Sequence, residues 1–192
     1  SEDWLKEAKK RGLPNVASTA EALKALEKKE NIALFEKYKV FSKEELLARY
    51  KIWIDMYNIT LEIEANTLNE MVNSCIVPAG CEYEQLLANN LLKLSSLKKE
   101  VKLKLDEAVL NDQKAHLSEV AEKIYYVRRN SKELVKLLGE AAKLHHEERA
   151  ELYFKELKPL MEHIRRHADD LERVVSDEHW DLPKYREMLF IK

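Results

Sequence analysis

Residues 42–75 have the sequence SKEELLARYKIWIDMYNITLEIEANTLNEMVNSC, and this stretch decides the fold. Its apolar and aromatic residues recur at alternating steps of three and four, which is the spacing of one face of a long α-helix. Ser42 and Glu45 have the spacing of a capping box, which predicts that the helix begins here. The row consists of Leu47, Tyr50, Ile54, Tyr57, Leu61, Glu64, Leu68, Met71 and Cys75.

Glu64 is the one carboxylate in this otherwise apolar row. A charge that is buried needs a partner, because burial without one is costly. Two structural interpretations are a satisfied buried salt bridge and an edge position that reaches water. The functional interpretation is an ion pair with a ligand or across an interface.

Pro78 falls where this helix would otherwise continue. Proline has no N–H to donate and its ring crowds the preceding turn, so it interrupts a regular helix. Residues 101–105 alternate with a period of two, but five residues without a partner strand favour helix in this setting. The apolar rhythm resumes after the proline, which predicts a kink and not an end, at Tyr83, Leu87, Leu91 and Leu94.

Two further apolar rows follow, and turn signals separate them. Asn111 and Asp112 predict a turn before the first of these rows, and Gly139 with His145–His146 predicts a reversal before the second. The first row consists of Leu117, Val120, Ile124, Val127, Ser131, Leu134 and Leu138. The second row, which Pro159 interrupts, consists of Ala150, Tyr153, Leu157, Leu160, Ile164, His167, Leu171 and Val174.

Three long amphipathic segments joined by short loops pack antiparallel, and the kinked first segment can count as two. We therefore expect an all-α fold, in which residues 42–178 form an antiparallel bundle of three to four long helices. We expect residues 1–41 to form small helices and connectors, and we expect the first helix to end at Gly12. Residues 179–192 form an irregular tail rich in aromatic and apolar side chains, which needs a surface on which to dock.

The composition excludes several classes of function. The 192 residues carry a formal net charge of −2, which favours neither nucleic acid nor an anionic membrane as a partner. No apolar run reaches the roughly 18 residues that would span a bilayer. Cys75 and Cys81 are six residues apart, which fits neither a zinc pair nor a disulfide framework. We interpret them as reduced thiols of a cytoplasmic protein.

No reactive constellation is complete in the sequence. A di-metal helical bundle needs a glutamate three residues before a histidine, and no histidine here has an acidic residue at that position. His163 and His167 share a helix face, but no set of cysteines or carboxylates completes a metal site around them. The glycine-rich phosphate motifs and the G-x-S-x-G motif are absent. The sequence therefore predicts no catalytic, cofactor-binding or metal-binding residue on this chain.

Three irregular stretches carry a family resemblance. The first is LPNV at 13–16 followed by EAL at 21–23, and the second has I-E-A-x-T-L-x-x-M-V at 63–72 with I-x-P-A at 76–79. The third is W-x-x-P-x-Y-x-E-M-L-F at 180–190. Together they resemble the C-terminal helical domain of type III glutamine synthetases, over almost the whole chain. Asp181 and Gly80–Cys81 depart from the family pattern and predict local differences in conformation.

The resemblance implies a parent enzyme that joins ammonia to glutamate with ATP and a divalent metal such as Mg. The catalytic domain of that family lies upstream, so residues 1–41 would lead from it, and ATP and Mg would belong to the parent and not to this chain. The implied role is a non-catalytic domain that packs on the catalytic domain and on other subunits of a cytoplasmic homo-oligomer. The expected docking residues of the tail are Trp180, Pro183, Tyr185, Met188, Leu189 and Phe190.

A second hypothesis stays open at this point. The chain could be a stand-alone helical-bundle module that binds partner helices along its apolar faces. The first residue is Ser1 and not Met, which favours a fragment of a longer enzyme. In that case the parent is an ATP-dependent glutamate–ammonia ligase, and we expect this chain alone to have no such activity.

Overall fold

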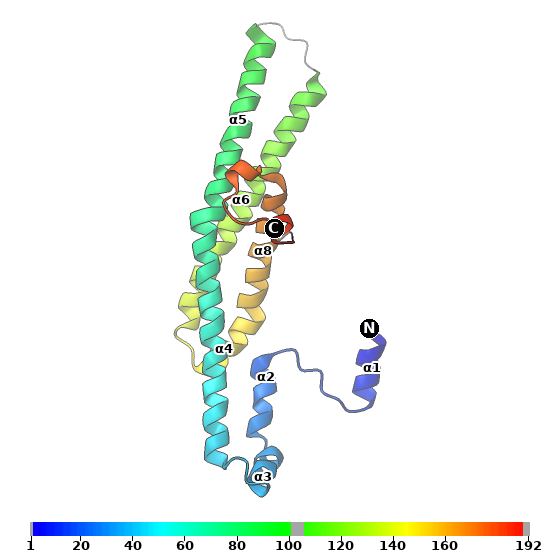
Figure 1. Ribbon diagram of the computed structural model, residues 1–192, viewed down its shortest axis with the longest axis vertical. Coiled ribbons are helices and arrows are strands. Elements are labelled where there is room, and N and C mark those ends of the chain that lie inside the picture. The colour runs from blue at the N-terminus through cyan, green and yellow to red at the C-terminus, as the bar shows by residue number, and fades with distance from the viewer. Residues whose placement is uncertain (1, 101–105, 190–192) are drawn as a thin grey trace. The chain divides into compact units, whose positions relative to one another are not determined.

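The computed structural model describes residues 2–100 and 106–189, and throughout these residues the regular structure is helical, without strands (Figure 1). This confirms the all-α prediction. No helix in the described part of the chain is both long and apolar enough to cross a membrane. The helices are α1 (Glu2–Lys10), α2 (Thr19–Leu23), α3 (Lys29–Lys37), α4 (Lys43–Met71), α5 (Val77–Glu100), α6 (Glu107–Ala141), α7 (His146–Leu152), α8 (Lys158–Val174) and α9 (Tyr185–Leu189).

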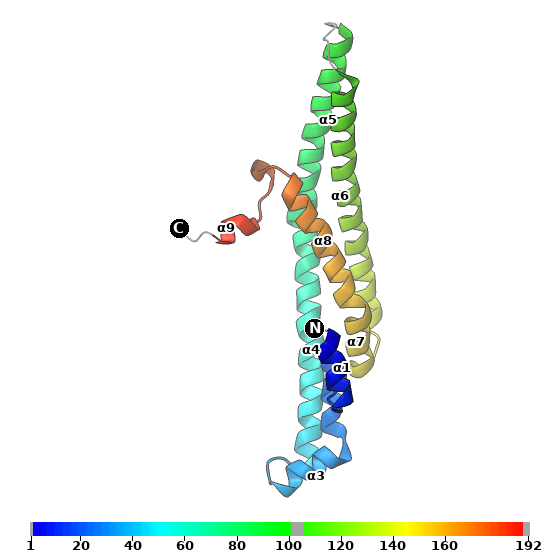
Figure 2. The same ribbon diagram turned by 90° about the vertical axis from the view of Figure 1, so that its right-hand side faces the viewer.

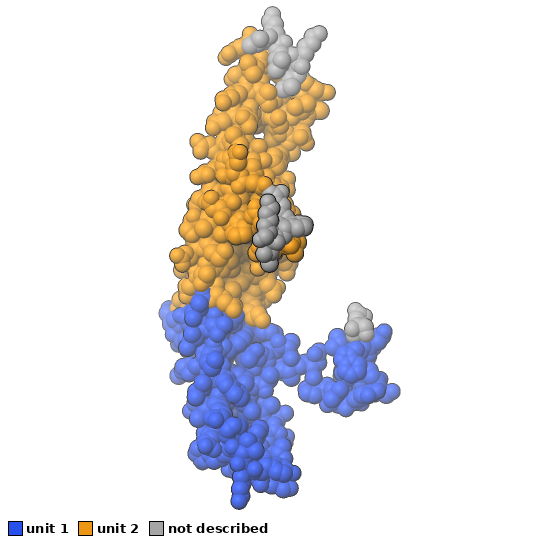
Figure 3. Space-filling model, in the orientation of Figure 1, with its two compact units in different colours: residues 1–63, 140–156 blue, residues 64–139, 157–192 orange. Residues whose placement is uncertain are grey.

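The chain divides into two compact units (Figure 3). Unit 1 comprises residues 1–63 and 140–156, and unit 2 comprises residues 64–139 and 157–192. In unit 1, Tyr50 and Ile54 of α4 are buried together with Ala20 of α2 and Ala150 of α7. In unit 2, α5, α6 and α8 lie side by side in both views (Figures 1 and 2). The core of unit 2 contains the fully buried Val72, Val120, Val127, Leu134, Ile164 and Leu171.

The predicted capping box at the start of α4 is confirmed. The Ser42 N–H donates to the Glu45 carboxylate at 2.8 Å, and the Glu45 N–H donates to the Ser42 hydroxyl at 3.2 Å. Each side chain thus satisfies an N–H group that the first helical turn leaves without a backbone partner. The end of α1 is also where the sequence predicts it, because Gly12 adopts a φ of +74°, a left-handed conformation that glycine reaches without strain.

The predicted row on α4 is right in its first half and wrong in its second. Tyr50, Ile54 and Leu61 are buried, but the buried positions that follow are Ala65 and Val72. Glu64 and Met71 of the predicted row are exposed. An α-helix of 3.6 residues per turn drifts by about 20° per heptad relative to a strict seven-residue repeat, so the buried face moves to the next residue. Glu64 therefore reaches water and is no buried ion pair.

Both prolines inside long helices follow a widened helical turn. A π-helical turn spans Val72–Ile76 before Pro78, and a second spans Tyr153–Leu157 before Pro159. In the first, the Val77 N–H donates to the Val72 carbonyl five residues earlier. The helix then continues as α5, so the proline does not end it, as the sequence predicts. A π-turn relieves the crowding that a proline ring would cause in a regular α-helical turn.

The prediction of a turn at Asn111 and Asp112 is wrong, because α6 runs through both residues. The N-terminal end of α6 is set earlier, where the Ala108 N–H donates to the Asp106 carboxylate at 3.0 Å. An Asx residue caps a helix as readily as it starts a turn, which is why the pattern misled. Residues 101–105, with their alternating pattern, lie outside the described residues.

The predicted reversal near Gly139 and His145–His146 is confirmed, since α6 ends at Ala141 and α7 begins at His146. Arg149 fixes this reversal. Its guanidinium donates to the carbonyls of Ala141, Ala142 and Leu144 at 3.0, 3.2 and 3.3 Å. These are carbonyls that the end of a helix leaves without intrahelical partners, so one side chain closes the corner.

Candidate functional site

The six residues expected to dock the tail differ in their exposure. Trp180 is buried, with 8% of its surface exposed, whereas Pro183 is exposed. Met188 and Leu189 are 55% and 79% exposed. The side chain of Tyr185 and the whole of Phe190 lie outside the described residues. The docking role of these six residues therefore stays a prediction.

Lys184 is the residue of the tail that the sequence analysis missed. Its buried ammonium group donates to the Val175 carbonyl at 2.8 Å and forms an ion pair with Asp177 at 3.0 Å. A buried lysine is stable only when its charge is compensated, and these two oxygens provide that compensation. Lys184 thereby closes the segment 175–184 into a loop that holds Trp180 against unit 2. Nothing in the spacing of charges along the sequence reveals this contact.

The tail also contacts α5. The ring of His179 lies 6.1 Å from the ring of Tyr83, and Nδ1 of the same histidine is 2.7 Å from the hydroxyl of Ser176. The Trp180 indole N–H is buried without a hydrogen-bond partner among the described residues. Burial of the indole ring therefore drives the docking, and its one polar atom opposes it.

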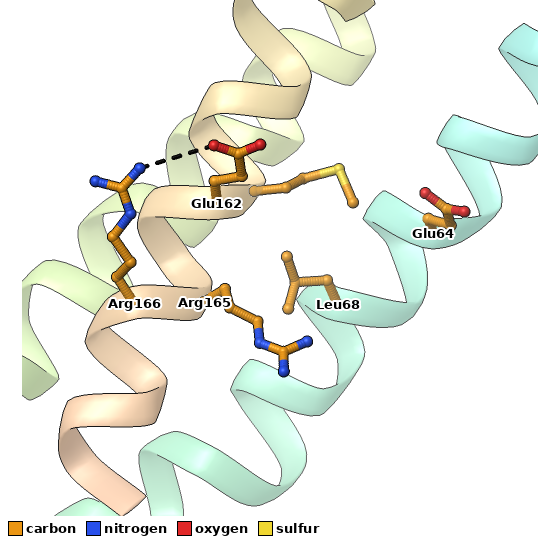
Figure 4. Close-up of a pocket in the computed structure, with 6 residues that line it drawn as sticks. Glu64, Leu68, Glu162, Arg165 and Arg166 are labelled. Carbon is orange, nitrogen blue, oxygen red and sulfur yellow. Dashed lines mark ion pairs between the residues drawn. The ribbon is translucent and has the colours of Figure 1, made fainter. Parts of the chain in front are cut away.

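A groove lies between the second half of α4 and α8 (Figure 4). Its volume is about 500 Å³, with Leu68 and Met161 as the apolar part of its lining. Arg165 reaches from α8 toward α4, while Arg166 points away and pairs with Glu162 at 3.7 Å (Figure 4). Glu64 lies at the edge of this groove.

The charges of this groove are largely satisfied by neighbours on the same helix. Arg165 pairs with Asp169 at 3.4 Å, one turn along α8, as Arg166 does with Glu162. Exposed pairs of this kind are weak and typical of a solvated helix face. The groove thus offers an apolar strip between mutually neutralised charges, and no group in it is set up for proton transfer or nucleophilic attack.

The histidines weighed as metal ligands have other surroundings. The ring of His167 stacks on Tyr126, with centroids 5.0 Å apart and an angle of 12° between the planes. His163 is exposed, and His146 pairs with Asp55 in unit 1. Among residues 2–100 and 106–189, no three or more His, Cys, Asp or Glu side chains converge as metal ligands would. We assign no step of metal chemistry to these residues.

The most unusual surface of the described chain is on the outer side of α4 in unit 1. Five large apolar side chains there are exposed, at 54, 43, 59, 56 and 60%. They leave α4 apolar on two opposite faces, one in the core and one in water. A monomeric protein rarely exposes so many apolar side chains together. We call them the outer row, and they are Ile52, Trp53, Met56, Ile59 and Ile63.

The outer row has a signal in the sequence, although it does not belong to the predicted row of α4. Ile52, Met56, Ile59 and Ile63 follow one another at steps of four, three and four. That is the same rhythm as the buried row, shifted to the other side of the helix. Because the two rows are interleaved in one segment, the residues of the outer row are easily taken for neighbours of the buried row.

Comparison with known proteins agrees with the resemblance seen in the sequence. The family described as glutamine synthetase C-terminal domain matches residues 1–95. The type-3 glutamine synthetase of Dictyostelium discoideum is 32% identical over 193 residues, covering 100% of this chain and 26% of that protein. A glutamine synthetase of Bacteroides fragilis (strain YCH46) is also 32% identical, over 197 residues with the same coverage. One from Butyrivibrio fibrisolvens is 26% identical over 193 residues.

The chain spans about a quarter of the length of the curated relatives that it matches. The match to those relatives extends over the two compact units, because it covers the whole chain. The helical architecture expected of such a domain is the one observed. Residues 1–95 therefore belong to the family of glutamine synthetase C-terminal domains, and the chain as a whole is similar to about a quarter of a type III glutamine synthetase.

Proposed function

We propose that this chain is a non-catalytic domain of a type III glutamine synthetase, and that its work is packing and oligomer assembly. The parent enzyme would join ammonia to glutamate at the expense of ATP. The observation that carries the proposal is the outer row of α4, a large apolar surface on a domain whose relatives are enzymes about four times its length.

The lining of the grooves supports a structural role. The groove between α4 and α8 contains charges paired along one helix, and such pairs position no reacting group. Catalysis of ligation needs sites for ATP and for metal ions. We place those sites in the part of the parent that this chain does not include, since the chain matches only 26% of the Dictyostelium enzyme.

The partners in this proposal are the catalytic domain and other subunits of the same enzyme. A cytoplasmic location accompanies it, which the free thiols of Cys75 and Cys81 support, because oxidising compartments favour disulfides. The rival hypothesis of a stand-alone interaction module has less support, because the relatives that match the whole chain are much longer proteins.

The proposal is tested on the Dictyostelium type-3 glutamine synthetase, in which the quarter that matches this chain can be deleted. We expect the deletion to lower the number of subunits per particle, which is the particle mass from mass photometry divided by the mass of the shortened subunit, because assembly surfaces are lost. A truncated enzyme that keeps the same number of subunits per particle contradicts the assembly role.

The non-catalytic part of the proposal has its own test. The 192-residue chain is incubated with glutamate, hydroxylamine, ATP and Mg, and γ-glutamyl hydroxamate is measured. We expect no ATP-dependent product. Reproducible turnover by the purified chain would show that it carries an active site and would overturn this part of the proposal.

A further inference from the structure

The outer row of α4 has a geometry that selects its partner. Its four axial members, Ile52, Met56, Ile59 and Ile63, lie at steps of four, three and four. This is the seam spacing by which one helix packs along another at a shallow angle. Trp53 widens the row on one side. The face therefore fits a helix of matching length better than it fits a flat or irregular surface.

The size of the row is that of an interface centre. Each of the five side chains leaves roughly 100 Å² in water, so together they present about 500 Å² of apolar surface. A specific protein–protein interface covers about 800 Å² on each partner, with an apolar centre and a polar rim. The outer row thus supplies about 500 Å² of such an area as its apolar centre, and the charged flanks are placed to form the polar rim.

The spacing of the row reads the same in both directions. Turned about the midpoint between Met56 and Ile59, the row places Ile52 opposite Ile63 of a second copy, and Met56 opposite Ile59. A twofold axis requires this kind of self-complementarity, because the same patch then serves both partners. A second α4 running antiparallel meets this condition without any change of register.

The flanking charges also favour an antiparallel copy. Lys51 and Glu62 lie on the same flank of the row, eleven residues or about three turns apart. An antiparallel copy brings Lys51 of one chain near Glu62 of the other, twice. A parallel copy would place the basic ends together and the acidic ends together. Asp55, on the same flank, already pairs with His146 of its own chain.

We propose that the outer row of α4 is a homotypic interface, in which α4 of one copy packs antiparallel on α4 of a second copy about a twofold axis between Met56 and Ile59. This inference rests on the proposed assembly role and names the surface that performs it. Charged substitutions in the row break the interface, because a carboxylate at its centre is desolvated opposite apolar side chains.

The first test measures the mass of the 192-residue chain by sedimentation equilibrium. We expect a dimer whose dissociation constant rises about 30-fold or more in the Ile59→Glu variant, as for a residue at the centre of an interface. Leu92→Glu is the matched control, because Leu92 is equally apolar and 66% exposed on α5 but lies outside the row. Unchanged helical circular dichroism in both variants excludes unfolding as the cause.

The second test reads the orientation of the two copies. Cys75 and Cys81 are first replaced by serine, and a single cysteine is then introduced by Ile52→Cys or by Ile63→Cys. In an antiparallel pair, residue 52 faces residue 63, while the two copies of residue 52 are about 16 Å apart. We therefore expect disulfide cross-linking in a mixture of the two variants and not in either alone.

Three results would overturn the inference: a monomer at all concentrations, a dimer that Ile59→Glu leaves intact, or cross-linking of Ile52→Cys with itself. None of these decides the proposed function, which the deletion in the Dictyostelium enzyme tests separately. If that deletion lowers the number of subunits per particle while the chain remains a monomer, the assembly role stands and this surface is wrong. If the deletion changes nothing while the dimer forms as expected, the assembly role is wrong.

Discussion

Gly80 lies on α5, where this helix closely approaches α6. A Cβ atom at this position would lie 2.9 Å from Cγ1 and 3.2 Å from Cδ1 of Ile124 on α6. A β-branched side chain in a buried row has little freedom to move aside. We therefore expect Gly80→Ala to destabilise the protein by about 1–3 kcal/mol in urea unfolding, in spite of the better helix propensity of alanine.

Gly139 provides the matched control for this prediction. It also lies in a helix, near the end of α6, but nothing stands within 4 Å of a Cβ atom built there. We expect Gly139→Ala to stabilise the protein by about 0.5 kcal/mol, because only the propensity difference remains. Equal effects of the two substitutions, or a stabilising Gly80→Ala, would contradict the close approach of α5 and α6.

At the scale of single residues, the sequence predicts contacts that are local and misses those that the fold brings together. The capping pair Ser42–Glu45 is predictable, because three residues separate its members and the contact needs only a helix start. The contact between the Lys184 ammonium group and the Val175 carbonyl is not, because it depends on the path of an irregular loop. Glu64 shows the same limit, since its exposure is decided by a drift accumulated along α4.

At the scale of elements, the ion pair between Lys24 and Glu151 ties the segment after α2 to α7 within unit 1. The Lys24 ammonium group lies 3.0 Å from the Glu151 carboxylate, and Lys155 lies 3.3 Å from it. Hydrogen bonds from Lys24 and Lys155 hold the pKa of the Glu151 carboxyl below its usual value. The hydrogen bond to Glu151 correspondingly raises the pKa of Lys24.

These shifts give a pH dependence with a definite sign. A lowered carboxyl pKa stabilises the fold above the unfolded-state pKa, and the effect is lost as the pH falls through the folded-state value. We expect Glu151→Gln to lower the melting temperature slightly at pH 7 in low salt and to have no effect near pH 3. The effect is small and sensitive to salt, since both groups are exposed. Glu148→Gln, also on α7, is the control, and an equal effect there would contradict a specific tie.

The helices themselves were largely predictable, because several independent features of the sequence indicate each of them. Rows of apolar residues identify α4, α6 and α8, and the two prolines predict where the long helices are disturbed. The form of the disturbance was not predictable, because a π-turn depends on how the helix repacks after the proline. The turn assigned to Asn111 and Asp112 failed because Asp106 already sets the start of α6, and the helix runs through both residues.

At the scale of the whole molecule, the sequence identified the family but not the surface that its proposed work requires. The family follows from irregular stretches far apart in the chain. The outer row could not be recognised from the sequence, because Ile52, Met56 and Ile59 lie in a segment that is apolar throughout. Only the exposure of each side chain in the structure distinguishes the outer face of α4 from the buried one. Which apolar face is left in water depends on the placement of α2 and α7, and no local pattern encodes that placement.

The exposure of the tail residues indicates which part of the tail packs on its own chain and which part is available to another subunit. Trp180 is buried in unit 2 and Lys184 closes the loop around it, whereas Met188 and Leu189 are exposed. We therefore expect a chain that ends at Lys184 to unfold within about 0.5 kcal/mol of the full-length chain. A chain that ends at His179 loses the indole as well and should be less stable by about 3–5 kcal/mol.

The two truncations are compared by urea unfolding at several protein concentrations, because docking within one chain makes the loss independent of concentration. If the chain ending at His179 is as stable as the one ending at Lys184, the indole does not hold the tail on its own unit, and the aromatic residues of the tail serve another subunit. If the chain ending at Lys184 already loses several kcal/mol, the stabilising contacts lie after Lys184, in the segment that contains Met188 and Leu189. The expected order instead divides the tail at Lys184, into a segment that completes unit 2 and an exposed segment free to contact the rest of the enzyme.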